Sequence, residues 1–185
     1  MDDPLDLGLR EYLDETATES PTPAGGAAAA VLAGLAAALT AMTARYSQDE
    51  WPDAGAAVAQ AETLRVRAEP LACEDVTAYA EVLRLRRESA GDEALGRALE
   101  RAADAPFRIA EVAADVAELA AHVADRCDPA VRVDAVAAAE LAHAAARVAA
   151  RLVDVNLTMR PGDERAARAA RLAEAAGRAA AALGT

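Results

Sequence analysis

The chain has 185 residues, of which 54% are hydrophobic and only 3% aromatic, and alanine makes up about 30% of it, far above ordinary usage. Alanine favours helices and disfavours strands, so an all-β fold is excluded and an all-α fold is expected. The 31 acidic residues outnumber the 19 basic ones, all of them arginine, and give a net charge of −12. Because such a surface repels a phosphate backbone, we expect no nucleic-acid partner.

The length is that of one domain, and neither an internal repeat nor a long linker divides residues 1–185. The two cysteines, Cys73 and Cys127, are far apart in sequence and form no CxxC pair. This usage is typical of a reducing compartment, so we expect a cytoplasmic protein without a disulfide framework.

Apolar periodicity and helix-breaking residues predict seven or eight helices joined by short connections. The first is a short amphipathic helix at 5–15, and a long apolar helix follows a proline-rich turn. The expected helices cover 5–15, 24–46, 54–68, 73–88, 93–104, the stretch from Pro106 to about Arg126, the stretch from Asp134 through Met159, and 163–182. We therefore expect a single-domain multi-helix bundle.

Residues 24–44 carry no charge and are long enough to cross a bilayer. Alanine and glycine dominate the segment, however, and the first twenty residues are acidic rather than basic as in a signal peptide. We favour a helix buried by protein, at the centre of the molecule or of a dimer, and expect no membrane partner. A membrane span is the alternative.

Gly25 and Gly26 are unusual, because glycine in a first helical turn costs about 1 kcal/mol relative to alanine. Either another helix or a ligand could need the close approach that glycine allows, and local features favour packing. His122 and His143 lie on separate expected helices without metal-like spacing, so we expect no metal. The sequence also lacks a phosphate-binding loop, a dinucleotide fingerprint and a nucleophile elbow.

Asp134 stands at the expected start of a long apolar helix. Its ordinary role would be that of an N-cap, which is common and worth about 1 kcal/mol. Its functional role would be that of a carboxylate in a cleft between helices, able to relay a proton. The residues alone favour the N-cap.

Six segments in the same order resemble the formiminotransferase-cyclodeaminase family, which includes methenyltetrahydrofolate cyclohydrolases. They cover roughly residues 9–160 and combine a proline-rich turn, a diglycine and an alanine-rich helix with several shorter motifs. The segments are Leu13–Glu15, Ser20–Ala30, Asp75–Tyr79, Ala105–Ala110, Val133–Asp134 and Val155–Leu157.

This resemblance implies an all-helical homodimer with a folate cleft near the glycine turn, acting on a tetrahydrofolate derivative as substrate. It makes Asp134 the best catalytic candidate, because a carboxylate can stabilise the cationic methenyl carbon and move a proton. Gly25, Gly26 and Asn156 become candidates for ligand contact. The spatial expectation is that the diglycine and Asp134 line one hollow.

The sequence departs from the family pattern where Ala24, Ala27 and Val133 replace a glycine and two serines, and where Leu152 replaces an asparagine. Where the family has a stretch that contains lysine, this chain has Gln-Asp-Glu at residues 48–50. The sequence therefore leaves open whether the chain is an enzyme, and whether it is a cyclohydrolase or a cyclodeaminase. The alternative is a catalytically degenerate helical dimer that binds another molecule or a protein partner.

Overall fold

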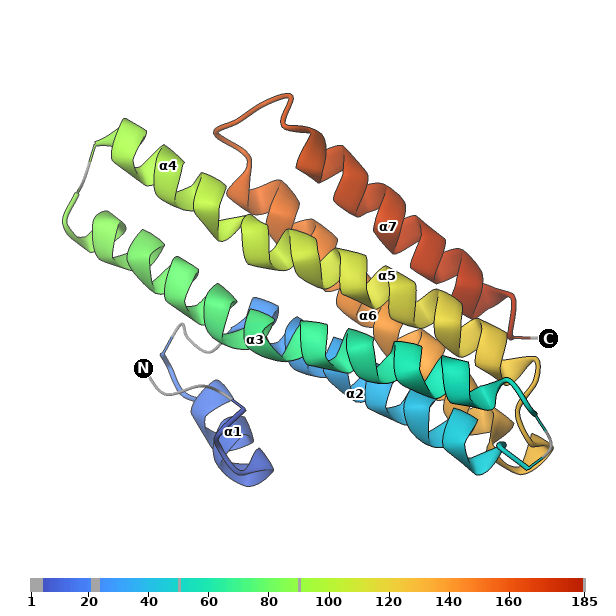
Figure 1. The fold of residues 1–185 in the computed structure, drawn as a ribbon. Coiled ribbons are helices and arrows are strands. Elements are labelled where there is room, and N and C mark those ends of the chain that lie inside the picture. Colours follow the sequence, from blue (N-terminus) through green and yellow to red (C-terminus); the bar gives the residue numbers. More distant parts are fainter. Residues whose placement is uncertain (1–4, 21–23, 50, 90, 185) are drawn as a thin grey trace.

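The computed structural model describes residues 5–20, 24–49, 51–89 and 91–184, and every regular element within them is helical (Figure 1). The all-α fold is thus confirmed. The elements are α1 (Leu9–Thr16), α2 (Gly25–Tyr46), α3 (Ala54–Arg87), α4 (Asp92–Ala102), α5 (Asp104–Ala124), a 3-10 turn (Pro129–Val131), α6 (Arg132–Asn156) and α7 (Glu164–Ala181). The turn expected at 21–23 lies outside the described residues.

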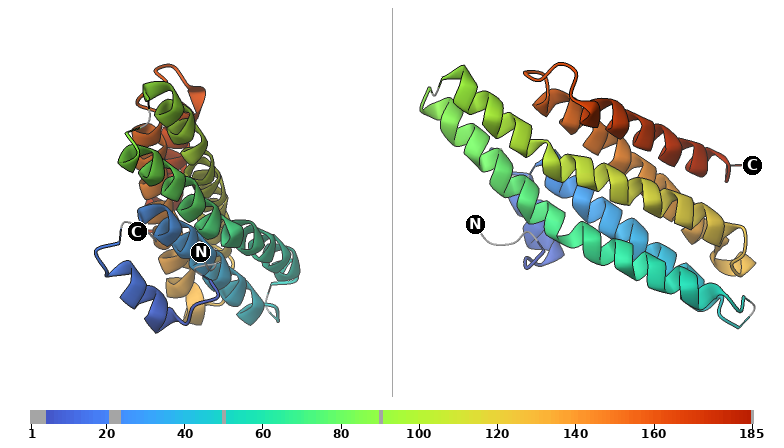
Figure 2. Two further views of the ribbon diagram at one scale, coloured as in Figure 1. Left: turned by 90° about the vertical axis from the view of Figure 1, so that its left-hand side faces the viewer. Right: turned by 45° about the horizontal axis from the view of Figure 1, so that its top comes forward.

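Helices α2, α3, α5 and α6 form the central bundle, in which α2 packs against the other three. Helix α7 covers α5 and α6, α4 packs on the second half of α3, and α1 stands apart from the bundle (Figures 1 and 2). The backbone N–H of Asp128 donates to Ser47 Oγ at 2.9 Å. This bond places the end of α2 beside the start of α6, so the two helices run antiparallel.

Alanine dominates the interface between the helices, and its small side chain lets the helix axes come close together. By length and composition, helix α2 is apolar enough to span a membrane. Of its most apolar 18-residue stretch, however, 56% is buried inside the folded chain. Leu35, Met42 and Tyr46 of α2 are exposed.

One helix, α3, replaces the two that we expected at 54–68 and 73–88. Proline inside a helix removes a hydrogen bond and costs about 3 kcal/mol. Pro70 is exposed, whereas Ala68, Leu71 and Ala72 beside it are fully packed in the core. Tertiary packing on both sides of the proline therefore offsets its cost, and α3 carries its second half past the start of α2.

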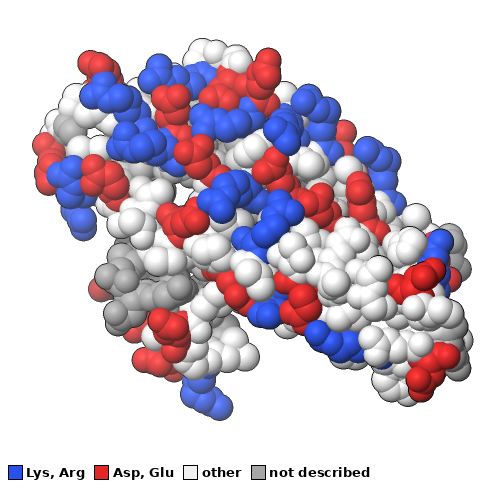
Figure 3. All heavy atoms as spheres, viewed as in Figure 1, with Lys and Arg blue, Asp and Glu red and all other residues white. Residues whose placement is uncertain are grey.

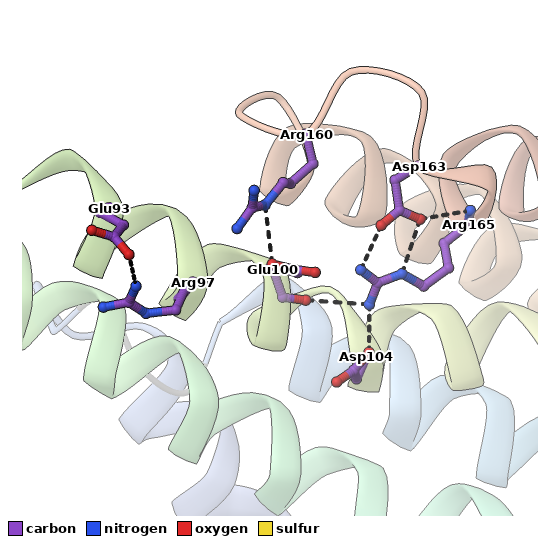
Figure 4. Close-up of polar contacts among 7 residues, drawn as sticks. All are labelled: Glu93, Arg97, Glu100, Asp104, Arg160, Asp163 and Arg165. Atoms are coloured by element: carbon purple, nitrogen blue, oxygen red, sulfur yellow. Dashed lines mark hydrogen bonds and ion pairs between the residues drawn. The ribbon is translucent and has the colours of Figure 1, made fainter.

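The connection between α6 and α7 is held against the junction of α4 and α5 (Figure 4). Asp163 accepts from the backbone N–H of Arg165 at 2.9 Å and so caps α7, at the position where the sequence predicts that the last helix starts. The Arg165 guanidinium also pairs with Asp104, and Arg160 pairs with Glu100. Hydrogen bonds from Arg165 hold the pKa of Asp163 at about 2, so that this carboxylate stays charged.

Candidate active site

A carboxyl group is buried at the N-terminus of α2. Asp75, from the middle of α3, is only 9% exposed. The antiparallel packing of α2 on α3 brings it opposite Gly26, and the backbone N–H of Ala27 donates to its carboxylate. The first N–H groups of a helix have no partner within the helix, and Ala24 at the N-cap offers no side-chain acceptor. Asp75 thus supplies a cap from another helix.

Gly26 makes this contact possible. A Cβ atom built on residue 26 would overlap the carboxyl carbon and both carboxyl oxygens of Asp75. Gly25 differs, since a Cβ there would have no atom within 4 Å. Gly26 therefore makes room for a side-chain carboxyl group rather than for another helix backbone, and this contact does not explain Gly25.

The environment of Asp75 raises its pKa from 3.8 to about 6, chiefly because burial disfavours the charged form. The hydrogen bond from the Ala27 N–H acts in the opposite direction and is the smaller effect. A carboxyl group with a pKa near 6 can both give and accept a proton close to neutral pH. Buried ionisable groups with raised pKa values are typical of catalytic sites.

Asp134 lies at the other end of the bundle. It is in the first turn of α6, half-exposed, while Gly25 and Gly26 begin α2, which runs antiparallel to α6. The expected N-cap role is wrong: α6 begins at Arg132, and Val131 is its N-cap. Within one chain, the structure does not bring Asp134 and the diglycine into one hollow.

Asn156 ends α6 and is buried. Its Nδ2 donates to the carbonyl oxygen of Ala102 at 2.9 Å. In a continuous helix this carbonyl would accept from the N–H of residue 106, which is a proline and has none. The amide of Asn156 therefore replaces a missing helical hydrogen bond at the junction of α4 and α5, which is a structural role for a residue predicted to contact ligand.

Asp75 belongs to one of the six family-like segments but is not among the site residues expected from the sequence. A signal was present, because Asp75 continues the spacing of Leu64, Ala68 and Leu71 along the apolar side of α3. A single acidic residue on an otherwise apolar helix face indicates a buried carboxyl. Sequence does not reveal that Gly26 lies against it.

The histidines take part in packing. The His122 ring lies 5.8 Å from that of Trp51, and the His143 ring packs against Gly177 where α6 and α7 meet. Among the described residues, no group of three or more His, Cys, Asp or Glu side chains is placed to hold a metal ion.

The fold and the site define an antiparallel helical bundle with a buried acid at a helix N-terminus. A family model described as formiminotransferase-cyclodeaminase matches residues 8–176. Among solved structures, the chain is similar to one described as formiminotetrahydrofolate cyclodeaminase from Thermotoga maritima. The two are 26% identical, the match covers 96% of this chain and 91% of that one, and the TM-score is 0.82. No curated protein matches the chain.

The chain belongs to the formiminotransferase-cyclodeaminase family, as its sequence motifs predict.

Proposed function

We propose that the protein is a folate enzyme of the cyclodeaminase or cyclohydrolase type, and that Asp75 moves the proton in its reaction. Family membership and the solved relative support this type of function. The observation that carries the residue assignment is the buried carboxyl group of Asp75, which has a pKa of about 6 and lies against the first turn of α2.

In the cyclodeaminase reaction, N10 of the folate attacks the carbon of the formimino group, whose nitrogen is protonated, and the amino group leaves as ammonia. The N10 proton must be removed, and the nitrogen that leaves must gain a proton. One carboxylate can accept the first proton and then, as a carboxylic acid, donate it to the leaving nitrogen. The C–N10 bond forms, the bond from carbon to the exocyclic nitrogen breaks, and Asp75 returns to its starting state.

The cyclohydrolase reaction needs the same group. A water molecule attacks the methenyl carbon and gives up a proton to the carboxylate. The bond between this carbon and N5 then breaks, the carboxylic acid returns the proton to N5, and the remaining hydroxyl proton passes to solvent as the formyl group forms on N10. Since both reactions need an acid and a base at one place, the Asp75 site supports either one.

The helix N-terminus adds an electrostatic contribution. The partial positive charge of the first turn of α2 stabilises the carboxylate form of Asp75. Its polar N–H groups also suit an electronegative atom of the substrate, so Gly25, which is open to solvent, is proposed as a contact residue.

A non-catalytic binding protein is the less favoured alternative. It would gain stability by replacing a buried acid with a neutral side chain, because burial of the charged form of Asp75 opposes folding at neutral pH. The chain retains the acid although the polar residues of the family pattern are replaced at Ala24, Ala27 and Val133.

The exposed apolar side of α2 supports a homodimer as part of the proposal. Leu35, Met42 and Tyr46 are 55%, 37% and 60% exposed, and Val133 at the start of α6 is 76% exposed. A second copy packed antiparallel on α2 would cover these side chains. It would also place Asp134 of one chain near the Gly26 end of the other, so that both predicted site regions would serve a single cleft.

The test is optical. Purified protein is mixed with methenyltetrahydrofolate, and separately with 5-formiminotetrahydrofolate, and the methenyl chromophore is followed. We expect loss of the chromophore in the first mixture or its formation in the second, at a rate above that in buffer. No acceleration in either mixture, together with no folate-induced rise in Tm, would contradict the proposed function. A cytoplasmic location without a membrane partner stays a prediction.

A further inference from the structure

A groove of about 890 Å³ runs along the outside of the bundle between α2 and α3. Its α2 wall lies between Ala30 and Ala38, and its α3 wall lies between Arg65 and Pro70. Leu5, from the segment before α1, lies against it. This groove is large enough for a ligand of the size of a folate.

The groove begins beside the candidate active site. Ala30 follows Gly26 by four residues, which is about 6 Å along a helix axis. On the opposite wall Pro70 precedes Asp75 by five residues in the antiparallel α3. Asp75 and Gly26 do not themselves line the groove, but a molecule that lies in it ends about 6–8 Å from their level, measured along the helix axes.

The middle of the groove is apolar. Val31, Leu35 and Val66 line it, and Gly34 contributes no side chain to its floor. Leu35 also belongs to the side of α2 that the proposed homodimer covers, so in the dimer this part of the groove lies at the interface of the two copies. A Cβ on residue 34 would meet only the Cβ of Ala68, at 3.8 Å. A flat aromatic body fits such walls.

The charged lining residues do not favour an anion. Arg65 is the one cation among the lining residues described, and it pairs with Glu69, which also lines the groove. Its Nε also donates to Glu62 at 2.8 Å, and Arg45 donates to the same carboxylate at 2.6 Å. Asp6 adds a further negative charge. Over the face drawn in Figure 3, acidic and basic side chains are interspersed.

On the basis of the proposed function, we propose that this groove binds the aromatic body of the folate beside Asp75, accepts one terminal glutamate, and gives no gain in affinity for a poly-γ-glutamyl tail. One of the two carboxylates of a terminal glutamate can share Arg65 with its glutamate partners. Each further carboxylate meets a neutralised cation in a chain of net charge −12, so Coulomb attraction does not reward it.

Calorimetric titration of the wild-type chain with 5-formyltetrahydrofolate carrying one or five glutamates tests the tail selectivity. We expect the two dissociation constants to agree within about twofold. Raising the salt concentration should increase the affinity of the pentaglutamyl form relative to the monoglutamyl form, because salt screens the repulsion between its carboxylates and the acidic chain. A pentaglutamyl form that binds about tenfold or more tightly would overturn the selectivity.

Two charge variants sharpen this test. Glu69→Gln frees Arg65 from one of its two partners, and we expect it to strengthen monoglutamyl and pentaglutamyl binding alike, by about twofold to fivefold, because each form places one carboxylate beside Arg65. The matched control is Glu93→Gln, which breaks the similarly spaced pair with Arg97 on α4. Equal effects of the two variants would contradict the role of the Arg65–Glu69 pair.

A filling variant tests the groove itself. Gly34→Leu places a side chain on the groove floor, and we expect monoglutamyl affinity to fall about tenfold or more. The control, Gly55→Leu, adds the same side chain where a Cβ has no neighbour within 4 Å. If the wild type neither binds nor converts any folate, the proposed function fails. If it converts folate and Gly34→Leu leaves KM and Kd unchanged, the groove assignment alone fails.

Discussion

The carboxyl group of Asp75 occupies the space that a side chain on residue 26 would fill, so that Gly26 and Asp75 form one unit. The pairing joins the start of α2 to the middle of α3 and buries an acid where a helix offers polar N–H groups. Its two members can be tested separately, because changes at residue 26 displace the carboxyl group and changes at residue 75 remove it.

Alanine at the two glycines should have opposite effects. Gly26→Ala forces the carboxyl of Asp75 out of its place, so we expect loss of activity and a fall in stability of about 1–3 kcal/mol. Gly25→Ala meets no atom, so we expect stability to be unchanged or raised by up to about 1 kcal/mol. Urea unfolding of both variants measures this, and equal losses would contradict the assigned contact.

Asp75→Asn should stabilise the protein at neutral pH. The pKa of Asp75 is raised from 3.8 to about 6 in the folded chain. The unfolded chain therefore loses its proton first as pH rises, and folding becomes less favourable between pH 4 and pH 6. This corresponds to about 3 kcal/mol at most.

The asparagine variant removes that cost. We expect its free energy of unfolding to exceed that of the wild type at pH 7.5, and the difference to vanish near pH 4. Chemical unfolding at both pH values measures it. A difference that does not change with pH would show that burial does not perturb this carboxyl group.

Asn156 and Pro106 should be energetically coupled. Asn156→Leu leaves the Ala102 carbonyl without a donor, at a cost of about 1–3 kcal/mol. Pro106→Ala restores an N–H at the position from which a helix would satisfy that carbonyl. In a double-mutant cycle we expect Asn156→Leu to cost less in the Pro106→Ala background. Additive effects would indicate that the amide has another role.

The sequence indicates the fold well because its signals are local. The alanine content predicts helices, residues such as Gly91, Pro129 and Asp163 lie at helix ends, and the family motifs identify the fold. One helix was expected as two, at 54–68 and 73–88, because a proline such as Pro70 usually interrupts a helix, and the core packing on both sides of it is a tertiary effect. The site was harder to predict, since the contact between Gly26 and Asp75 depends on the register of two antiparallel helices.

The assignment of Asp134 stays a prediction, and the proposed dimer gives it a test. Asp75→Asn and Asp134→Asn homodimers are prepared separately, mixed, and allowed to exchange subunits. If each cleft uses Asp75 of one chain and Asp134 of the other, half of the dimers regain one intact site, which restores about one quarter of the wild-type activity. Light scattering on the unmixed proteins should give twice the chain mass.

No recovery from the mixture would exclude a shared site if each single variant is inactive. Full activity of Asp134→Asn by itself would remove this residue from the site and leave Asp75 as the acid. A monomer mass would contradict the dimer directly.

The pH dependence of kcat/KM for methenyltetrahydrofolate, corrected for the rate in buffer, tests the role of Asp75 most directly. We expect an inflection near pH 6 in the wild type, set by this carboxyl group in the free protein. In Asp75→Asn we expect the inflection to disappear and the rate to fall about 100-fold or more. The exposed Asp115→Asn is the control. A folded Asp75→Asn protein with the wild-type rate and pH profile would contradict the account.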